Sequence, residues 1–165
     1  MKPKNKKKLY KLSNNSSLQI ELKNGIVVIK DDCTKTTSEL LKAVGCPYWS
    51  FWNDLLDTDF PIPKKTTRRK FKWIQEADPE HKNKSANDCE KDGLQGIKLR
   101  ERLIFEKLWF DKMGTHLDVK NITLCTGSRS SDGGVPGVHW DGGRMRVGWD
   151  SPSGQGDDLR SRVAV

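Results

Sequence analysis

The run VPGVHWDGGRMRVGW, residues 135–149, decides how the last third of the chain folds. Two runs of alternating residues, 135–140 and 144–149, flank Asp141-Gly142-Gly143. Asp-Gly between alternating runs is the strongest short-range signal of a β-hairpin, because glycine supplies the positive φ angles of a tight turn. The sequence therefore predicts a hairpin.

The two faces of this hairpin differ in composition. Successive side chains of a strand point to opposite faces, so the core face is expected to carry Val138, Trp140, Met145, Val147 and Trp149. The other face carries Gly137, His139, Arg144, Arg146 and Gly148. Glycine inside a strand weakens the sheet. We therefore expect the second face to be an open surface that serves something other than stability.

The rest of the chain predicts an α+β fold. The alternating run 159–165 is expected to pair as a third strand, and residues 122–125 to form a strand before the hairpin. Residues 99–113 predict a helix capped by Gly114, whose apolar stripe is broad and whose charged side chains form a narrow solvated face, namely Arg100, Arg102, Glu106 and Lys107.

The first half of the chain carries three further local signals. A capping box, Thr36 to Glu39, predicts a helix over 37–44 that ends at Gly45. Asn24-Gly25 predicts a hairpin between 18–21 and 26–29. Aromatic residues are dense over 47–60, which is typical of a sealed core.

Composition limits the classes of function. Of the net charge of +8 on 165 residues, six charges come from lysines in residues 2–11, which leaves +2 on the remainder. We predict a disordered basic tail over 1–12 and a single domain over 13–165, and we do not expect a nucleic-acid partner. No membrane span or secretory signal is readable, so we expect synthesis in the cytoplasm or assembly into a virion, with the location otherwise undetermined.

Catalytic and cofactor motifs are near misses. Thr126-Gly127-Ser128-Arg129-Ser130 lacks the order of a nucleophile elbow. Gly154-Gln155-Gly156 lacks the third glycine and the helix of a dinucleotide loop. The four cysteines have no zinc-ligand spacing and are expected to be reduced. Turn formation explains the aspartates of the terminal loops more simply than acid–base catalysis does, and calcium binding by them is an alternative. We expect no catalytic residue, cofactor or metal.

Residues 98–165 resemble the variable proteins of diversity-generating retroelements. The resemblance rests on the long helix, on Gly127-Ser128-Arg129, on the strands ending in Trp140 and Trp149, and on the closing Leu159-Arg160-Ser161-Arg162. It implies a C-type lectin fold, related to the formylglycine-generating enzyme, with a small twisted antiparallel sheet, a long packed helix, a C-terminal hairpin and a final strand. It also implies a ligand- or receptor-binding protein encoded by a virus, phage or mobile element.

The resemblance also implies a division of residues within a diversified segment of about 126–160. In this family, adenines of AAC codons are substituted, which can yield Gly, Ser, Asp, His or Arg but never Trp, Met or Gln. Trp140, Met145, Trp149 and Gln155 would then belong to the fixed scaffold, and Leu159 is assigned to the scaffold with them. The variable, ligand-binding positions would be Ser130, Gly134, Gly137, His139, Asp141, Gly142, Arg146, Gly148, Asp150, Ser151, Gly154, Gly156 and Asp157. The ligand, an unknown protein or surface, and the oligomeric state do not follow from the sequence.

A second resemblance leads to a different class. Residues 134–141 are similar to the opening strand of the AP2 DNA-binding domain, and Arg144 and Arg146 follow. Arginines on a strand can read guanine in the major groove, but no segment remains for the helix that packs behind an AP2 sheet, so sequence-specific DNA binding is the alternative. An unspecialised α+β domain whose glycines lie in loops is the third interpretation.

Overall fold

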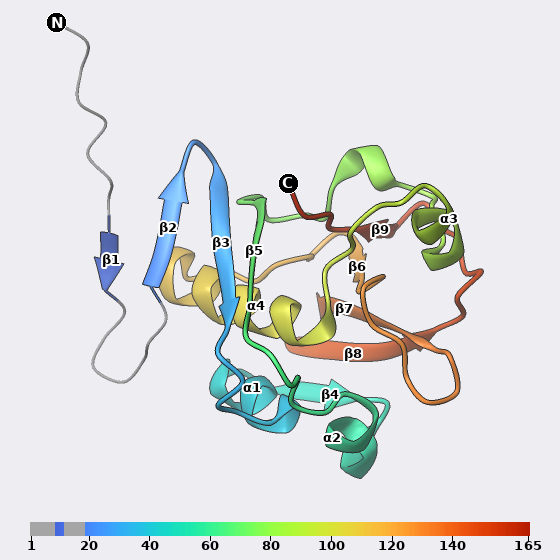
Figure 1. Cartoon of the computed structure of the whole chain (residues 1–165), viewed down its shortest axis with the longest axis horizontal. Coiled ribbons are helices and arrows are strands. Elements are labelled where there is room, and N and C mark those ends of the chain that lie inside the picture. Colours follow the sequence, from blue (N-terminus) through green and yellow to red (C-terminus); the bar gives the residue numbers. More distant parts are fainter. Residues whose placement is uncertain (1–8, 12–18) are drawn as a thin grey trace, which may run out of the picture.

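The computed structural model describes residues 9–11 and 19–165, which form two β-sheets and a long helix, so the protein belongs to the α+β class (Figure 1). One sheet has the order β1-β2-β3-β5 and is antiparallel, with β1 (Leu9–Lys11), β2 (Gln19–Lys23), β3 (Ile26–Asp31) and β5 (Thr67–Lys72). The other has the order β4-β8-β7-β6-β9, with β4 (Tyr48–Ser50), β8 (Arg144–Asp150), β7 (Val135–Asp141), β6 (Ile122–Leu124) and β9 (Leu159–Ser161).

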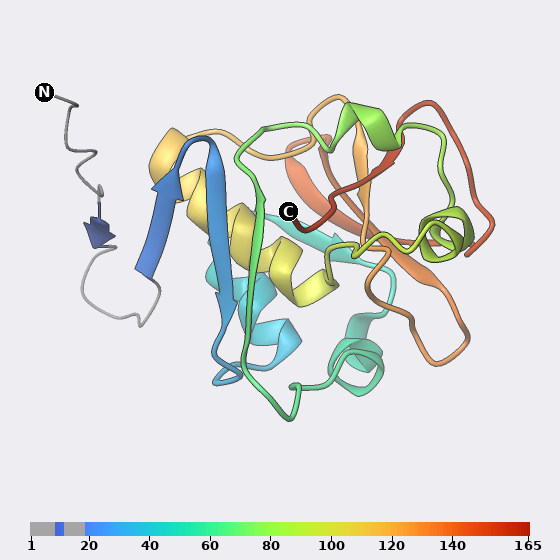
Figure 2. The ribbon, with the colours of Figure 1, turned by 45° about the horizontal axis from the view of Figure 1, so that its top comes forward.

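Helices connect and cover these sheets. They are α1 (Thr37–Ala43), α2 (Leu56–Asp59), α3 (Ala86–Lys91) and α4 (Leu99–Met113), with short 3₁₀ turns η1 (Asn53–Leu55) and η2 (Pro79–His81). Figures 1 and 2 show α4 between the four-stranded sheet and the strands β7 and β8. Phe105 of α4 is buried in one cluster with Phe71 of β5 and Val147 of β8. A single core therefore joins α4 to both sheets.

Local signals placed several elements correctly. The capping box at the start of α1 is confirmed, because the Thr36 hydroxyl accepts from Glu39 N at 3.1 Å and Glu39 Oε2 accepts from Thr36 N at 3.0 Å. The turn between β2 and β3 is also confirmed, with positive φ angles at Asn24 and Gly25. Helix α4 has the predicted bounds and ends at Gly114 with φ of 69°.

The predicted solvated face of α4 is wrong for three of its four residues, and only Lys107 of the four is partly exposed. Arg100, Arg102 and Glu106 are buried, although each is charged. Arg100 pairs with Asp31 of β3 at 2.7 Å, and Arg102 pairs with Glu106 at 2.7 Å. Charges can be buried when they are paired and hydrogen-bonded, so both sides of α4 pack against protein.

The aromatic side chains of the segment after α1 are only partly buried, although the sequence predicted that they seal a core. Trp52 and Phe60 are buried, as expected for residues that seal a core. Tyr48, Trp49 and Phe51 are exposed by 39%, 40% and 51%, so the core prediction is wrong for these three. The reason is the topology, because β4 is an edge strand of the five-stranded sheet.

The two ends of the chain also differ from the predictions. The last strand, β9, is shorter than predicted and pairs parallel with β6 rather than with the hairpin. Residues Leu9–Lys11, which were predicted to belong to the basic tail, form β1 and pair with β2. The remaining tail positions lie outside the described residues.

Candidate ligand-binding surface

The predicted hairpin is present and is one residue longer on each strand. Strands β7 and β8 pair in the register Asp141↔Arg144 to Val135↔Asp150. The turn consists of Gly142 and Gly143, with φ of 60° and 77°. Two successive positive φ angles match the twist of the flanking strands and favour glycine. The turn therefore fixes which side chains share a face.

The inner face of the hairpin is mostly the expected one. Val138, Met145 and Val147 are buried, and Trp140 is half-buried with its ring 3.6 Å from that of His116. Trp149 was predicted to be core and is 38% exposed, so that prediction is wrong. It lies near the end of β8, its Nε1 donates to Asp132 Oδ1 at 3.2 Å, and its ring lies 6.5 Å from that of Phe51.

The outer face carries a row of three large side chains across three strands. Trp49 of β4 pairs with Arg146 of β8, which pairs with His139 of β7. Paired residues direct their side chains to the same face. Within the described chain, the buried side-chain nitrogens without a hydrogen-bond partner include His139 Nδ1 and Arg146 Nε. We define this row, with Arg144, Gly148, Asp141 and Gly142, as the open face.

Electrostatics in this row keep the histidine neutral. Burial lowers the pKa of His139, and the neighbouring charge of Arg146 lowers it further, while Asp141 opposes both. Arg146 Nε lies 3.3 Å from Asp141 Oδ2, as an ion pair without hydrogen-bond geometry. The open face thus offers a neutral imidazole and a guanidinium whose donors are not fully used.

Two glycines are directly paired across the hairpin, and they differ in how much space surrounds them. Gly148 is open, since a Cβ added there would lie 3.8 Å from Gly137 O. Gly137 is buried, and a Cβ there would overlap the carboxylate of Asp150 and press on Ile122. Burial raises the pKa of Asp150, and Asp158 adds to that rise. The expectation that Gly137 belongs to an open surface is therefore wrong.

The loop before β7 is also packed rather than open. Ser130 is buried and its hydroxyl donates to Asp132. Gly134 is buried, and a Cβ there would overlap the indole of Trp149. Side chains larger than hydrogen at Gly134 would displace Trp149. Ser130 and Gly134 are therefore packed positions beside Asp132 and Trp149 and do not belong to an open surface.

The loop after β8 carries the remaining predicted positions. Ser151, Gly154 and Gly156 are half-buried and Asp157 is exposed. The loop is tied to the segment around α3, because Asn83 Nδ2 donates to Asp157 Oδ1 at 3.0 Å and Gln155 Nε2 donates to Asp88 Oδ2 at 2.7 Å. Leu159 packs with a small cluster of Ala86, Leu124 and Val135.

The predicted positions on the hairpin therefore fall into three groups. Asp141 and Gly142 lie at the turn, whereas Asp150 pairs with Val135 at the opposite end of the hairpin. The half-buried His139, Arg146 and Gly148 lie between. The structure brings these three together and adds Trp49, which sequence reasoning had assigned to the core. The sequence signal for Trp49 was the density of aromatic residues next to a proline. Such density cannot distinguish an exposed edge strand from a buried strand.

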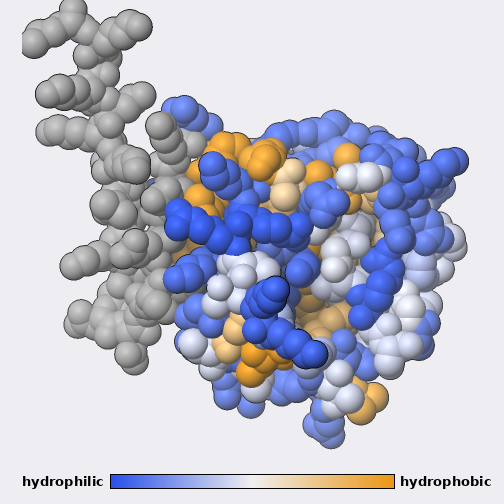
Figure 3. Space-filling model, viewed as in Figure 1, coloured by the Kyte–Doolittle hydropathy of each residue, from blue (hydrophilic) through white to orange (hydrophobic). Residues whose placement is uncertain are grey.

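Hydrophobic side chains are exposed in several places. On the face shown in Figure 3 they form separate areas within a mostly hydrophilic surface. Trp49 of the open face is exposed, as are its chain neighbours Tyr48 and Phe51 and also Trp149, whose ring lies 6.5 Å from that of Phe51. Large apolar side chains that gather at a surface mark interaction sites in soluble proteins.

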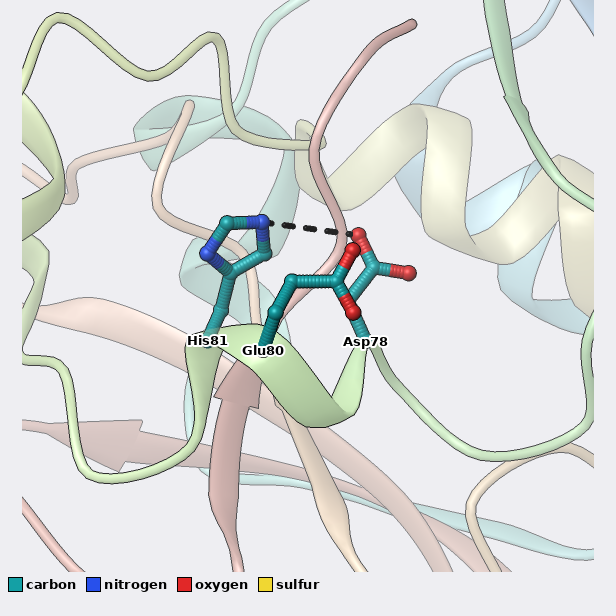
Figure 4. A group of neighbouring side chains, drawn as sticks. All are labelled: Asp78, Glu80 and His81. Atoms are coloured by element: carbon teal, nitrogen blue, oxygen red, sulfur yellow. Dashed lines mark ion pairs between the residues drawn. The ribbon is translucent and has the colours of Figure 1, made fainter.

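A separate group of potential metal ligands lies at η2, away from the hairpin turn. Asp78, Glu80 and His81 each offer an atom within 4.8 Å of the others (Figure 4). These groups already have partners, because Asp78 Oδ2 accepts from Val163 N at 3.1 Å and Lys72 contacts Glu80. His81 Nε2 lies 3.8 Å from Asp78 Oδ2. The ammonium of Lys72 supplies the positive charge that a cation would otherwise bring.

The four cysteines are free thiols. Cys125 is fully buried, and burial raises the pKa of its thiol. Burial likewise raises the pKa of the Cys33, Cys46 and Cys89 thiols. Nucleophilic cysteines require the opposite shift, so none of the four is arranged as an activated nucleophile.

Comparison of the sequence with protein families and with curated proteins, and of the fold with solved structures, gives no match. Among the helices that the structure describes, none has the length and apolar character required to cross a membrane.

Proposed function

We propose that this protein is a ligand-binding protein with a C-type lectin-like fold, whose open face is varied by a diversity-generating retroelement. The observation that carries the proposal is the row Trp49–Arg146–His139, which places an aromatic ring, a guanidinium and a neutral imidazole side by side on a sheet whose inner side is densely packed. Partly exposed aromatic and polar side chains held on a rigid support are what a binding surface presents before its ligand arrives.

The division between fixed and variable residues supports this proposal. Met145 is buried and cannot arise from an AAC codon, whereas His139, Arg146 and Gly148 are permitted products and lie on the open face. Asp141, Gly142, Asp150, Ser151, Gly154, Gly156 and Asp157 extend the variable set at the two ends. Ser130, Gly134 and Gly137 support the surface, and Trp49 is its constant neighbour.

A library experiment tests the proposal directly. One library randomises His139, Arg146 and Gly148 with the products of AAC codons, and a matched library randomises Val138, Met145 and Val147 with the same set. We expect most members of the first library to fold and most of the second to aggregate, because large core truncations cost about 2–5 kcal/mol each. Selection of the first library against unrelated surface proteins should yield specific binders. Equal loss of folding in both libraries would contradict the proposal.

The gene neighbourhood gives an independent test. The proposal requires a reverse transcriptase gene nearby and a near-copy of the final coding segment that differs from it at adenines. Viral or mobile-element origin is part of the same proposal. Absence of both genetic elements would remove its basis.

DNA binding by Arg144 and Arg146 is the alternative outcome of a third test. A variant without residues 1–11 lacks six of the lysine charges, so the positive electrostatic field of the remaining protein is weak. We expect affinity for duplex no tighter than the nonspecific range of about 10⁻⁴ to 10⁻⁶ M at physiological salt. Sequence-dependent nanomolar binding that Arg146→Ala abolishes would replace our proposal by the DNA-binding one.

A further inference from the structure

Strand β4 has one edge that no strand occupies. It is the first strand in the sheet order and pairs only with β8, in parallel. Pro47 O accepts from Met145 N, and Phe51 N donates to Val147 O, each at 2.9 Å. In a parallel pair, alternate residues direct both backbone groups at the partner. The backbone groups of Tyr48 and Ser50 therefore point away from β8, and in the described chain they have no hydrogen-bond partner.

The free edge faces a hollow of about 490 Å³. Tyr48 and Ser50 line it from β4, Ser38 and Lys42 line it from α1, and Asp54 and Asp57 line it from the η1–α2 segment. Figure 1 shows β4 with α1 and α2 beside it. Ser50 is 6% exposed, so its unpaired backbone groups lie at the base of the hollow rather than in open solvent. Backbone N–H and C=O groups at the edge of a sheet are donors and acceptors that an added strand can pair with.

The side chains around the hollow indicate the chemistry of that partner. Tyr48 and Trp49 offer exposed rings. Asp54 and Asp57 outnumber the single cation, Lys42, in a chain whose net charge is +8. Burial alone would raise the pKa of Asp57, but hydrogen bonds from Ser38 N at 2.7 Å and Ser38 Oγ at 2.6 Å lower it overall. The hollow therefore keeps a negative charge next to aromatic surface.

We infer that this hollow is a docking groove for an extended peptide segment of a partner protein, which adds as a strand to β4 and places a lysine or arginine side chain against Asp54 and Asp57. Strand addition supplies affinity through main-chain hydrogen bonds and specificity through pockets for alternate side chains. The groove residues lie outside the segment 126–160, so a constant partner would recognise every variant of the open face. The inference does not depend on the proposed function.

A peptide titration of the ¹⁵N-labelled protein tests the inference. The probe is a capped pentapeptide of alternating threonine and valine with a central lysine. We expect it to shift the amide resonances of Tyr48 and Ser50 and to slow their hydrogen exchange, because both N–H groups gain acceptors. The same peptide N-methylated on the backbone that faces β4 should produce neither effect. A peptide with glutamate in place of lysine should bind more weakly.

Protein variants complete the test. Asp54→Asn should weaken binding of the lysine peptide about two- to fivefold, the range of an exposed charge pair, whereas Asp59→Asn, on α2 but outside the hollow, should not. Ser50→Pro removes the N–H that points into the groove and leaves the bonds to β8, so binding should be lost. His139→Ala should leave peptide binding unchanged, which separates this site from the open face.

Three results would overturn the inference. The first is equal binding of the N-methylated peptide, which would show that only side chains enter the hollow. The second is a set of shifts centred on β7 and β8 instead of β4. The third is no shift at about millimolar peptide, where even weak strand addition is detectable.

Discussion

The two faces of the five-stranded sheet satisfy their polar groups in opposite ways. On the inner side, Asp118 is fully buried and accepts hydrogen bonds from Arg102 Nη2 at 2.9 Å, Arg162 Nη2 at 2.9 Å and Thr123 Oγ1 at 2.5 Å. On the outer side, His139 Nδ1 has no hydrogen-bond partner in the described chain, and Arg146 Nε has only the exposed carboxylate of Asp141, at 3.3 Å and without hydrogen-bond geometry. Both sides contain arginine, so residue type alone does not separate structure from binding. The difference is whether each donor already has an acceptor.

The largest effect is expected on the inner side. Asp118→Ala would leave the guanidinium groups of Arg102 and Arg162 buried without their shared carboxylate, so the free energy of unfolding should fall by about 3–5 kcal/mol. Urea unfolding followed by tryptophan fluorescence measures this loss. The matched variant is Asp141→Ala, which removes the partner of Arg146 on the outer side and should cost less than about 1 kcal/mol. Similar losses in the two variants would erase the distinction between the faces.

A smaller effect on stability is expected at Gly137, where the Asp150 carboxylate covers the outer face. Gly137→Ala would displace the Asp150 carboxylate and press on Ile122, at a cost of about 1 kcal/mol. Gly148→Ala, at the directly paired position, meets nothing closer than 3.8 Å and should change stability by less than about 0.5 kcal/mol. Thermal unfolding of the pair gives the comparison. If Gly148→Ala lowers the melting temperature more than Gly137→Ala does, Gly148 is packed and the centre of the open face is covered.

Local signals predicted much of the fold, and long-range pairing accounts for what they missed. The turn at Gly142-Gly143, the capping box of α1 and helix α4 depend on residues close in sequence, so they were readable. The burial of Arg102 was not readable, because its partner Asp118 lies in a loop 16 residues away. The exposure of Trp49 depends on β4 being an edge strand, which is a property of the whole sheet.

The same reasoning explains the candidate site. Alternation placed His139, Arg146 and Gly148 on one face correctly. It could not show that Asp150 covers Gly137 or that Trp149 covers Gly134, because alternation gives a direction and not the distance to a neighbour.

Asp150 provides a pH-dependent test of the closed part of the outer face. Its pKa is raised in the folded protein by burial and by Asp158, above an ordinary value of 3.8. The folded state therefore binds the proton more tightly, and wild-type stability should fall as the pH rises from 3.8 through the folded pKa. Asp150→Asn removes this penalty, so it should stabilise the protein at neutral pH and not below pH 3.8. Melting curves across this range decide the matter, and a variant that is less stable at neutral pH would contradict the assignment.

The smallest effect is expected at the open row itself. His139→Ala should change stability by less than about 0.5 kcal/mol at pH 8, because the lost Nδ1 atom makes no hydrogen bond in the folded state. Burial holds the pKa of His139 below its ordinary value of 6.5, so the unfolded state binds more protons and the wild type should lose stability as the pH falls through that value. The alanine variant lacks this loss, and its stability relative to wild type should therefore rise between pH 8 and pH 5. Urea unfolding at both pH values measures the change. If the alanine variant is instead less stable relative to the wild type at pH 5 than at pH 8, protonated His139 has a partner in the folded protein. The imidazole would then stabilise the fold and would not be part of the binding surface.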